Sequence, residues 1–163
     1  MSGNEHHYAV TVQWTGNTGT GTSAYRAYER AHEISGAVPG KPTIAGTSDP
    51  AYRGDPARWN PEELLVASLS ACHKLWYLHV CAVNRVVVTD YVDHAEGWMP
   101  VDAKGMGSFR RVLLRPIVTI AADSDAERAR ELHDDAHRMC NVASSVNFPI
   151  DHEPEIRVEQ PVA

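Results

Sequence analysis

The sequence predicts an α+β domain in which groups of strands alternate with two helices. Three observations favour this fold class: alternating and β-branched segments before, between and after the helices, a strong helix start at Asn60, and a second capped helix near residue 125. The chain shows no internal repeat, and this order of elements favours α+β over a wound parallel sheet. Its 163 residues suit one domain over 1–163, with the polar residues 1–7 as a mobile tail.

The first third of the chain predicts a hairpin followed by a long irregular connection. Residues 8–14 alternate apolar and polar side chains, and the small residues of 16–21 interrupt the pattern, as a strand and its turn do. A second strand is expected over 24–34. Glycine and proline then recur through residues 36–56. Connections of this length are uncommon in compact domains unless they serve a site, so this segment is a candidate for function.

A long buried helix is predicted to begin at Asn60. Asn60 suits the N-cap, Pro61 the first helical position, and the carboxylates of Glu62 and Glu63 the positive end of the helix dipole. The apolar residues that follow cover more than one side, so the helix is expected to be buried on most sides. Residues 64–83 approach the length of a membrane span, but histidine and lysine side chains within them favour a soluble protein.

The second half of the chain predicts strands, a helix and a last strand. Residues 85–93 and 111–121 are rich in β-branched side chains, and the glycines between them indicate a hairpin connection. The run Asp123-Ser124-Asp125 caps a second helix that extends to Cys140. A short strand over 156–158 follows two prolines.

Composition excludes several classes of function. The 15 basic and 21 acidic residues give a net charge of −6 with no basic patch, so nucleic acid and membrane are not expected as partners. The N-terminus lacks the pattern of a secretion signal, which predicts a cytoplasmic protein. Three cysteines, Cys72, Cys81 and Cys140, are an odd number, and in a reducing compartment they are expected to be buried, catalytic or metal-binding.

A reactive Cys72 needs a cation near it, because burial in a helix raises the pKa of a thiol. Arg53 and Arg58 lie upstream in the irregular segment, and Glu62 has the chemistry to hold either guanidinium. Glu62 and Cys72 are ten residues apart, roughly 15 Å along one helix at about 1.5 Å per residue. If two copies of the helix pack antiparallel, Glu62 of one chain approaches Cys72 of the other.

The run Asn60-Pro61-Glu62-Glu63-Leu64-Leu65, then Ser70-Ala71-Cys72, with Cys140 at the end of a later helix, resembles the OsmC/Ohr family of hydroperoxide reductases. The resemblance implies an OsmC-like fold with antiparallel sheets around long central helices, in an intertwined homodimer. It also implies a peroxidatic Cys72, a resolving Cys140, and an arginine and Glu62 that hold the thiolate. Arg53 is the best match for that arginine, and the alternatives are Arg26, Arg30 and Arg58.

The function that follows is a thiol-dependent peroxidase that reduces organic hydroperoxides to alcohols in an oxidative stress response. It needs no bound cofactor, only an external dithiol or protein reductant. Cys140 leads into Asn141-Val142 where the family commonly has Pro-Val, which indicates a divergent subgroup. An apolar substrate pocket is expected from four side chains: Trp59, Leu69, Trp76 and Phe148.

Two other interpretations stay open at this stage. Cys81 has no supporting motif and is expected to serve packing. An OsmC-fold protein that binds a metal or small ligand without peroxidase activity is the main alternative, since His133 and His137 share a helix face at i, i+4. No Cys-x-x-Cys or His-Glu-x-x-His motif organises these ligands, so no metal site is assigned.

Overall fold

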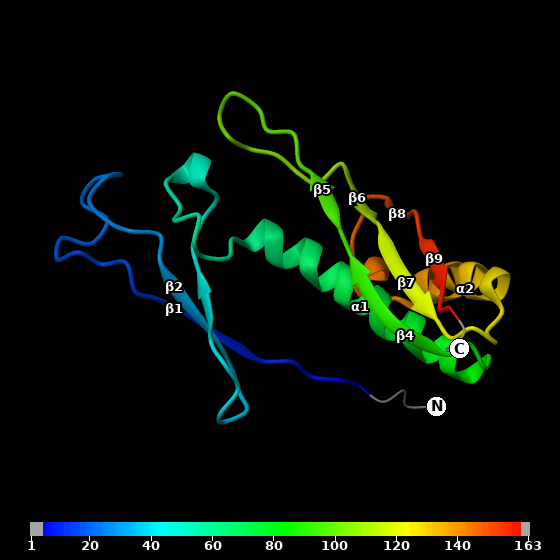
Figure 1. The fold of residues 1–163 in the computed structure, drawn as a ribbon. Helices are drawn as coiled ribbons and strands as arrows, with labels where there is room; N and C mark the ends of the chain where they lie inside the picture. The colour runs from blue at the N-terminus through cyan, green and yellow to red at the C-terminus, as the bar shows by residue number, and fades with distance from the viewer. Residues whose placement is uncertain (1–4, 161–163) are drawn as a thin grey trace. The chain divides into compact units, whose positions relative to one another are not determined.

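The computed structural model describes residues 5–160, and the chain divides into two compact units, 1–64 and 65–163 (Figure 1). Of the predicted tail, residues 1–4 lie outside the described residues, and residues 5–7 are exposed and outside any strand. The expectation of one domain over 1–163 concerns how the two units pack together and stays a prediction.

The first unit contains an antiparallel three-stranded sheet in the order β1 (Val10–Trp14), β2 (His32–Gly36), β3 (Ile44–Gly46). The second strand begins later than the expected 24–34 because residues 17–30 form a wide loop. The Asn17 side chain holds this loop by accepting the backbone N–H groups of Gly19 and Gly21, which both have positive φ.

No hydrophobic side chain is buried in the described part of this unit, residues 5–64. Every residue of β1 is exposed, including Val10 and Val12. The irregular segment after β3 holds one short 3-10 helix, Pro50–Tyr52, whose N-cap Asp49 accepts the N–H of Ala51 at 2.7 Å. Residues 5–64 therefore contribute no apolar core of their own.

The long helix α1 (Pro61–Val83) begins where the sequence predicts. Asn60 Oδ1 accepts the Glu63 N–H at 2.8 Å, and Glu63 Oε2 accepts the Asn60 N–H at 3.1 Å, which is a reciprocal capping box. The buried residues Leu69, His73, Tyr77 and Val80 form one stripe at helical spacing. By length and hydropathy α1 meets the criteria for a membrane span, as core helices of soluble proteins also do.

The second unit contains two three-stranded sheets. One has the order β4 (Val88–Asp93), β7 (Pro116–Ile120), β9 (Glu155–Val158), and the other β5 (Glu96–Trp98), β6 (Arg111–Leu114), β8 (Ile150–His152). In each sheet the first pair of strands is antiparallel and the second is parallel.

The strand expected over 111–121 is two successive strands, β6 and β7 (Figure 1), and hydrogen bonding assigns them to different sheets. The break lies at Arg115, whose N–H is taken by the Asp93 carboxylate at 2.7 Å instead of by a neighbouring strand. Pro116 follows and has no N–H to donate to a sheet. The chain therefore changes sheets at this point.

Helix α2 (Ala126–Met139) begins at the N-cap Asp125, which accepts the N–H groups of Glu127 and Arg128, and it ends at Cys140. Two apolar clusters fill the second unit. One joins α1 to α2 and β7, and the other joins α1 to β6 and β8. The first cluster contains residues of both helices, so it holds α1 and α2 against each other and positions the side chains that they carry.

Candidate active site

Cys72 and Cys140 come together from different helices of the second unit. Cys72 lies in the middle of α1 and is half-buried, whereas Cys140 lies at the C-cap of α2 and is 1% exposed. Their side chains are close enough for Cys72 to influence the pKa of Cys140 although 68 residues separate them in the sequence, and both are free thiols. The disulfide pairing of these two cysteines stays a prediction.

The surroundings of Cys140 keep its thiol protonated. Burial, and after it the hydrogen bond to Cys72, raises the pKa of Cys140 to about 11, against smaller opposing effects of backbone N–H groups. One of these is the N–H of Ala143, which lies 3.4 Å from Cys140 Sγ in the turn after α2. Because Cys72 is more exposed than Cys140, Cys72 is the cysteine of the pair that an incoming molecule reaches first.

Cys81 lies in a different environment. It is 1% exposed within the core between α1 and α2, and burial raises the pKa of its thiol, with the hydrogen bond to Tyr77 opposing the shift. A buried protonated thiol of this kind is chemically quiet. The environment agrees with the packing role expected from the sequence.

A buried pair of histidines lies on the same two helices as the cysteines. His73 follows Cys72 in α1, and His133 lies two turns before Cys140 in α2. His73 Nε2 and His133 Nδ1 are 3.0 Å apart, and both residues are at most 1% exposed. Burial lowers the pKa of His73 to about 4 and lowers that of His133 as well, and the nearby His152 adds to both shifts. Both rings are therefore neutral at pH 7. Nothing in the sequence pattern indicates that these two side chains meet.

The candidate metal ligands do not assemble into a metal site within residues 5–160. No group of three or more histidine, cysteine, aspartate or glutamate side chains there has the geometry to hold a metal ion. His137 and His152 have ring centroids 5.6 Å apart, and His152 Nε2 contacts the Asp134 carboxylate at 3.0 Å. These residues form an ordinary histidine cluster near the surface.

Glu62 and Arg53 lie in the first unit. Glu62 is in the first turn of α1, and its Oε2 atom is buried with no hydrogen-bond partner among the described residues. Arg53 is exposed, adopts the left-handed conformation (φ 67°) at the end of the 3-10 helix, and has no ion pair within residues 5–160. Arg58, in contrast, is paired with Glu33 at 3.1 Å.

The other arginines named from the sequence differ in their hydrogen bonds and ion pairs. Arg30 donates to the backbone carbonyls of Tyr28 and Tyr25 and lies over both rings. With Arg58 in its ion pair and Arg30 held in this loop, Arg53 is better placed than either to bind a further group. Within the part of the chain that the structure describes, the Arg26 side chain makes no hydrogen bond or ion pair.

The family model of OsmC-like protein matches residues 54–155 of this sequence. The chain belongs to the OsmC-like protein family. The matched range includes the α1 capping box, both cysteines of the pair and all strands of the second unit but the last residues of β9. No functionally curated protein is similar enough to match the chain.

Solved structures share this OsmC fold over nearly the whole chain. An OsmC-like protein of unknown function from Vibrio cholerae O1 biovar eltor is 29% identical, with a TM-score of 0.82 over 92% of this chain and 99% of that one. An organic hydroperoxide resistance protein from Elizabethkingia anophelis is 15% identical, with a TM-score of 0.67 over 96% and 99%. One from Legionella pneumophila is 15% identical, with a TM-score of 0.64 over 95% and 99%.

The four predicted pocket residues of this OsmC-like protein have different surroundings. Leu69 is fully buried in the core beside β6, and Phe148 packs at the edge of that core against Phe109. Trp76 is half-buried against the other core, and Trp59 is 52% exposed in the first unit. Their role in binding substrate stays a prediction.

Proposed function

We propose that this OsmC-like protein is a thiol-dependent peroxidase that reduces organic hydroperoxides to alcohols through Cys72 and Cys140. The observation that supports this most strongly is the proximity of the two thiols, one half-exposed and one buried and protonated. The Elizabethkingia and Legionella neighbours are named as organic hydroperoxide resistance proteins, which supports the same substrate class.

In the first step the Cys72 thiolate attacks the terminal oxygen of the hydroperoxide. The S–O bond forms as the O–O bond breaks, and the alkoxide takes up from solvent the proton that the Cys72 thiol released on ionising and leaves as the alcohol. Cys72 becomes a sulfenic acid, and the peroxide has gained the two electrons that the sulfur lost.

In the second step Cys140 condenses with the sulfenic acid. The S–S bond forms, the S–O bond breaks, and the hydroxide departs as water with the proton that Cys140 carried. The high pKa of Cys140 suits this role, because a protonated resolving thiol does not compete with Cys72 for peroxide. An external dithiol then reduces the disulfide by exchange and is itself oxidised.

The proposal includes a homodimer. The first unit has no buried apolar side chain in residues 5–64, so its exposed β1 needs a covering surface. Helix α1 also has an exposed strip of residues at i, i+4 spacing: Ala67, Ala71 and Leu75, of which Leu75 is 63% exposed. We expect this strip to pack against α1 of a second chain. Small residues let a second helix approach closely.

The dimer also supplies Glu62 and Arg53 with a role. A buried carboxylate oxygen without a hydrogen-bond partner is costly, so Glu62 is expected to gain a donor when the second chain binds. We infer that Arg53 is that donor and that the pair stabilises the Cys72 thiolate of the partner chain by charge.

The proposed activity is tested by hydroperoxide consumption. Cumene hydroperoxide is offered with several dithiols in turn to wild type, Cys72→Ser and the matched control Cys81→Ser. We expect loss of turnover in the Cys72 variant and wild-type rates in the Cys81 variant, because Cys81 is enclosed in the core. Equal rates of hydroperoxide consumption by all three proteins would reject the proposed peroxidase activity of Cys72.

The shared site is tested separately with mixed dimers. Glu62→Gln chains and Cys72→Ser chains are each expected to be inactive alone. If Glu62 serves the partner's cysteine, a mixed dimer has one site with both residues intact and recovers part of the wild-type rate. No recovery in dimers shown to be mixed contradicts the shared site but leaves the cysteine chemistry in place.

A further inference from the structure

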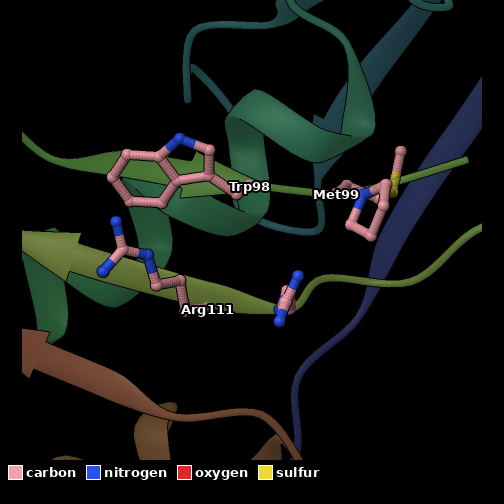
Figure 2. A pocket seen from close by; sticks show the side chains of 5 residues that line it. Trp98, Met99 and Arg111 are labelled. Atoms are coloured by element: carbon pink, nitrogen blue, oxygen red, sulfur yellow. The ribbon is translucent and has the colours of Figure 1, made fainter.

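A groove in the second unit gathers two arginines and a tryptophan on the hairpin formed by β5 and β6. Its volume is about 630 Å³, and it is lined by Trp98, Met99, Pro100, Arg110 and Arg111 (Figure 2). This volume falls in the range of small-molecule sites, roughly 300–1,000 Å³. The proposed peroxidase chemistry uses none of these residues.

The strand register fixes Trp98 and Arg111 against each other. They are directly opposite in the antiparallel β5–β6 pair, and the Arg110 N–H donates to the Trp98 carbonyl at 2.7 Å. The Arg111 guanidinium carbon lies 4.2 Å from the centre of the Trp98 ring (Figure 2). This stacking occupies the face of the guanidinium, so its in-plane N–H donors remain directed outward for another acceptor.

The carboxylates of the hairpin are engaged elsewhere. Glu96 is ion-paired with Arg115, and Asp102 accepts the backbone N–H groups of Lys104 and Met106 in the turn. Neither Arg110 nor Arg111 has an ion pair within residues 5–160. Two unneutralised positive charges therefore lie beside an aromatic and aliphatic wall, in a protein whose net charge is −6.

We propose that this groove binds a small organic anion that combines a carboxylate or phosphate with a flat apolar body. The paired N–H donors of an arginine guanidinium match the spacing of two oxygens in a carboxylate or a phosphate. Apolar surface for the body of the ligand comes from Trp98, Met99 and Pro100. A neutral molecule of the same shape lacks the attraction of both arginines. The site is independent of the cysteines and of the peroxidase.

The test uses calorimetric titration with three naphthalene probes: 2-naphthoate, 1-naphthyl phosphate and the neutral 2-naphthamide. Both anions are expected to bind and the amide to bind at least tenfold more weakly, and raising the salt concentration is expected to weaken the anions only. The ratio of the two anion affinities tells which anion the groove prefers.

Variants then assign the binding to the groove. Arg111→Gln and Arg110→Gln are each expected to weaken 2-naphthoate about tenfold, since a charge-assisted hydrogen bond is lost. The matched control is Arg130→Gln, the same charge change at an exposed arginine that pairs with Glu127 on α2. It is expected to bind like wild type, and so is Cys72→Ser, which separates the groove from the proposed active site.

Three results would overturn the proposal: no binding of either anion at millimolar concentration, equal binding of the amide, or the same affinity in the Arg111 and Arg130 variants. The amide and salt comparisons use wild-type protein, so they decide the question even if an arginine variant fails to fold.

Discussion

Lowering the pH from 7 to 5 is predicted to destabilise the protein through the buried pair of His73 and His133. Their ring nitrogens are 3.0 Å apart, so one neutral ring donates the hydrogen bond and the other accepts it. His73 Nδ1 and His133 Nε2 have no hydrogen-bond partner within the described residues. A proton on either ring would place an uncompensated charge in the core, between α1 and α2.

The size and sign of the effect follow from the pKa values. A folded-state pKa below the unfolded value means that the unfolded chain binds more protons, so stability is complete above about pH 6.5 and falls as the pH decreases. For His73, with a folded pKa of about 4 against 6.5, the loss at pH 5 is about 2 kcal/mol. The pKa of His133 is lowered in the same direction, and its contribution brings the loss to about 4 kcal/mol.

Urea unfolding at pH 7 and pH 5 measures this loss. The informative variant is the double substitution His73→Leu with His133→Leu, because removing both partners leaves no orphaned ring nitrogen. The matched control is His79→Leu, an exposed histidine on the same helix. Wild type and His79→Leu are expected to lose about 4 kcal/mol more between the two pH values than the double variant does.

Equal pH dependence in wild type and the double variant would refute the reasoning. A second measurement does not depend on the variants folding. In the nuclear magnetic resonance spectrum of wild type, the His73 ring is expected to stay neutral between pH 8 and pH 5. Titration of His73 near pH 6.5 would contradict the predicted burial of a neutral pair.

Three further predictions concern single positions. Asn60→Ala removes the side-chain oxygen that accepts the Glu63 N–H in the capping box. It is expected to lower the free energy of unfolding by about 1 kcal/mol, measured by urea titration. Gly97→Ala places a Cβ 2.6 Å from the ring of Phe109, so the thermal midpoint is expected to fall by the equivalent of about 1–3 kcal/mol, and an unchanged midpoint would argue against this packing. Cys140→Ser is expected to leave the first reaction of Cys72 with hydroperoxide intact but to trap the sulfenic acid, visible as one added oxygen by mass spectrometry.

Local signals in the sequence were sufficient for both helices. The Asn60 and Asp125 caps act within one turn, so the start of α1 and of α2 could be predicted from a few neighbouring residues. The change of sheet at Arg115 could not, because the β-branched pattern runs through it and the break depends on Asp93, which is distant in sequence. The short strands β3, β5 and β8 have three residues each and leave too little pattern to recognise.

The two members of the proposed active site that meet in the fold, Cys72 and Cys140, were predicted from the family resemblance. The local sequence alone predicts a buried thiol at Cys72, since nothing in its neighbourhood reveals where α2 ends. The His73–His133 pair and the Trp98–Arg111 stack were missed for the same reason. Each depends on which helices pack together or which strands pair, and the residue spacing within a single element does not reveal its partner.

The most direct test of the central claim is the state of the cysteines after one equivalent of organic hydroperoxide. The reduced wild-type protein is treated, blocked with a thiol reagent, digested and analysed by mass spectrometry. The proposal predicts a disulfide between Cys72 and Cys140, with Cys81 recovered as the blocked thiol. Recovery of all three cysteines as blocked thiols, with the hydroperoxide unconsumed, would contradict it.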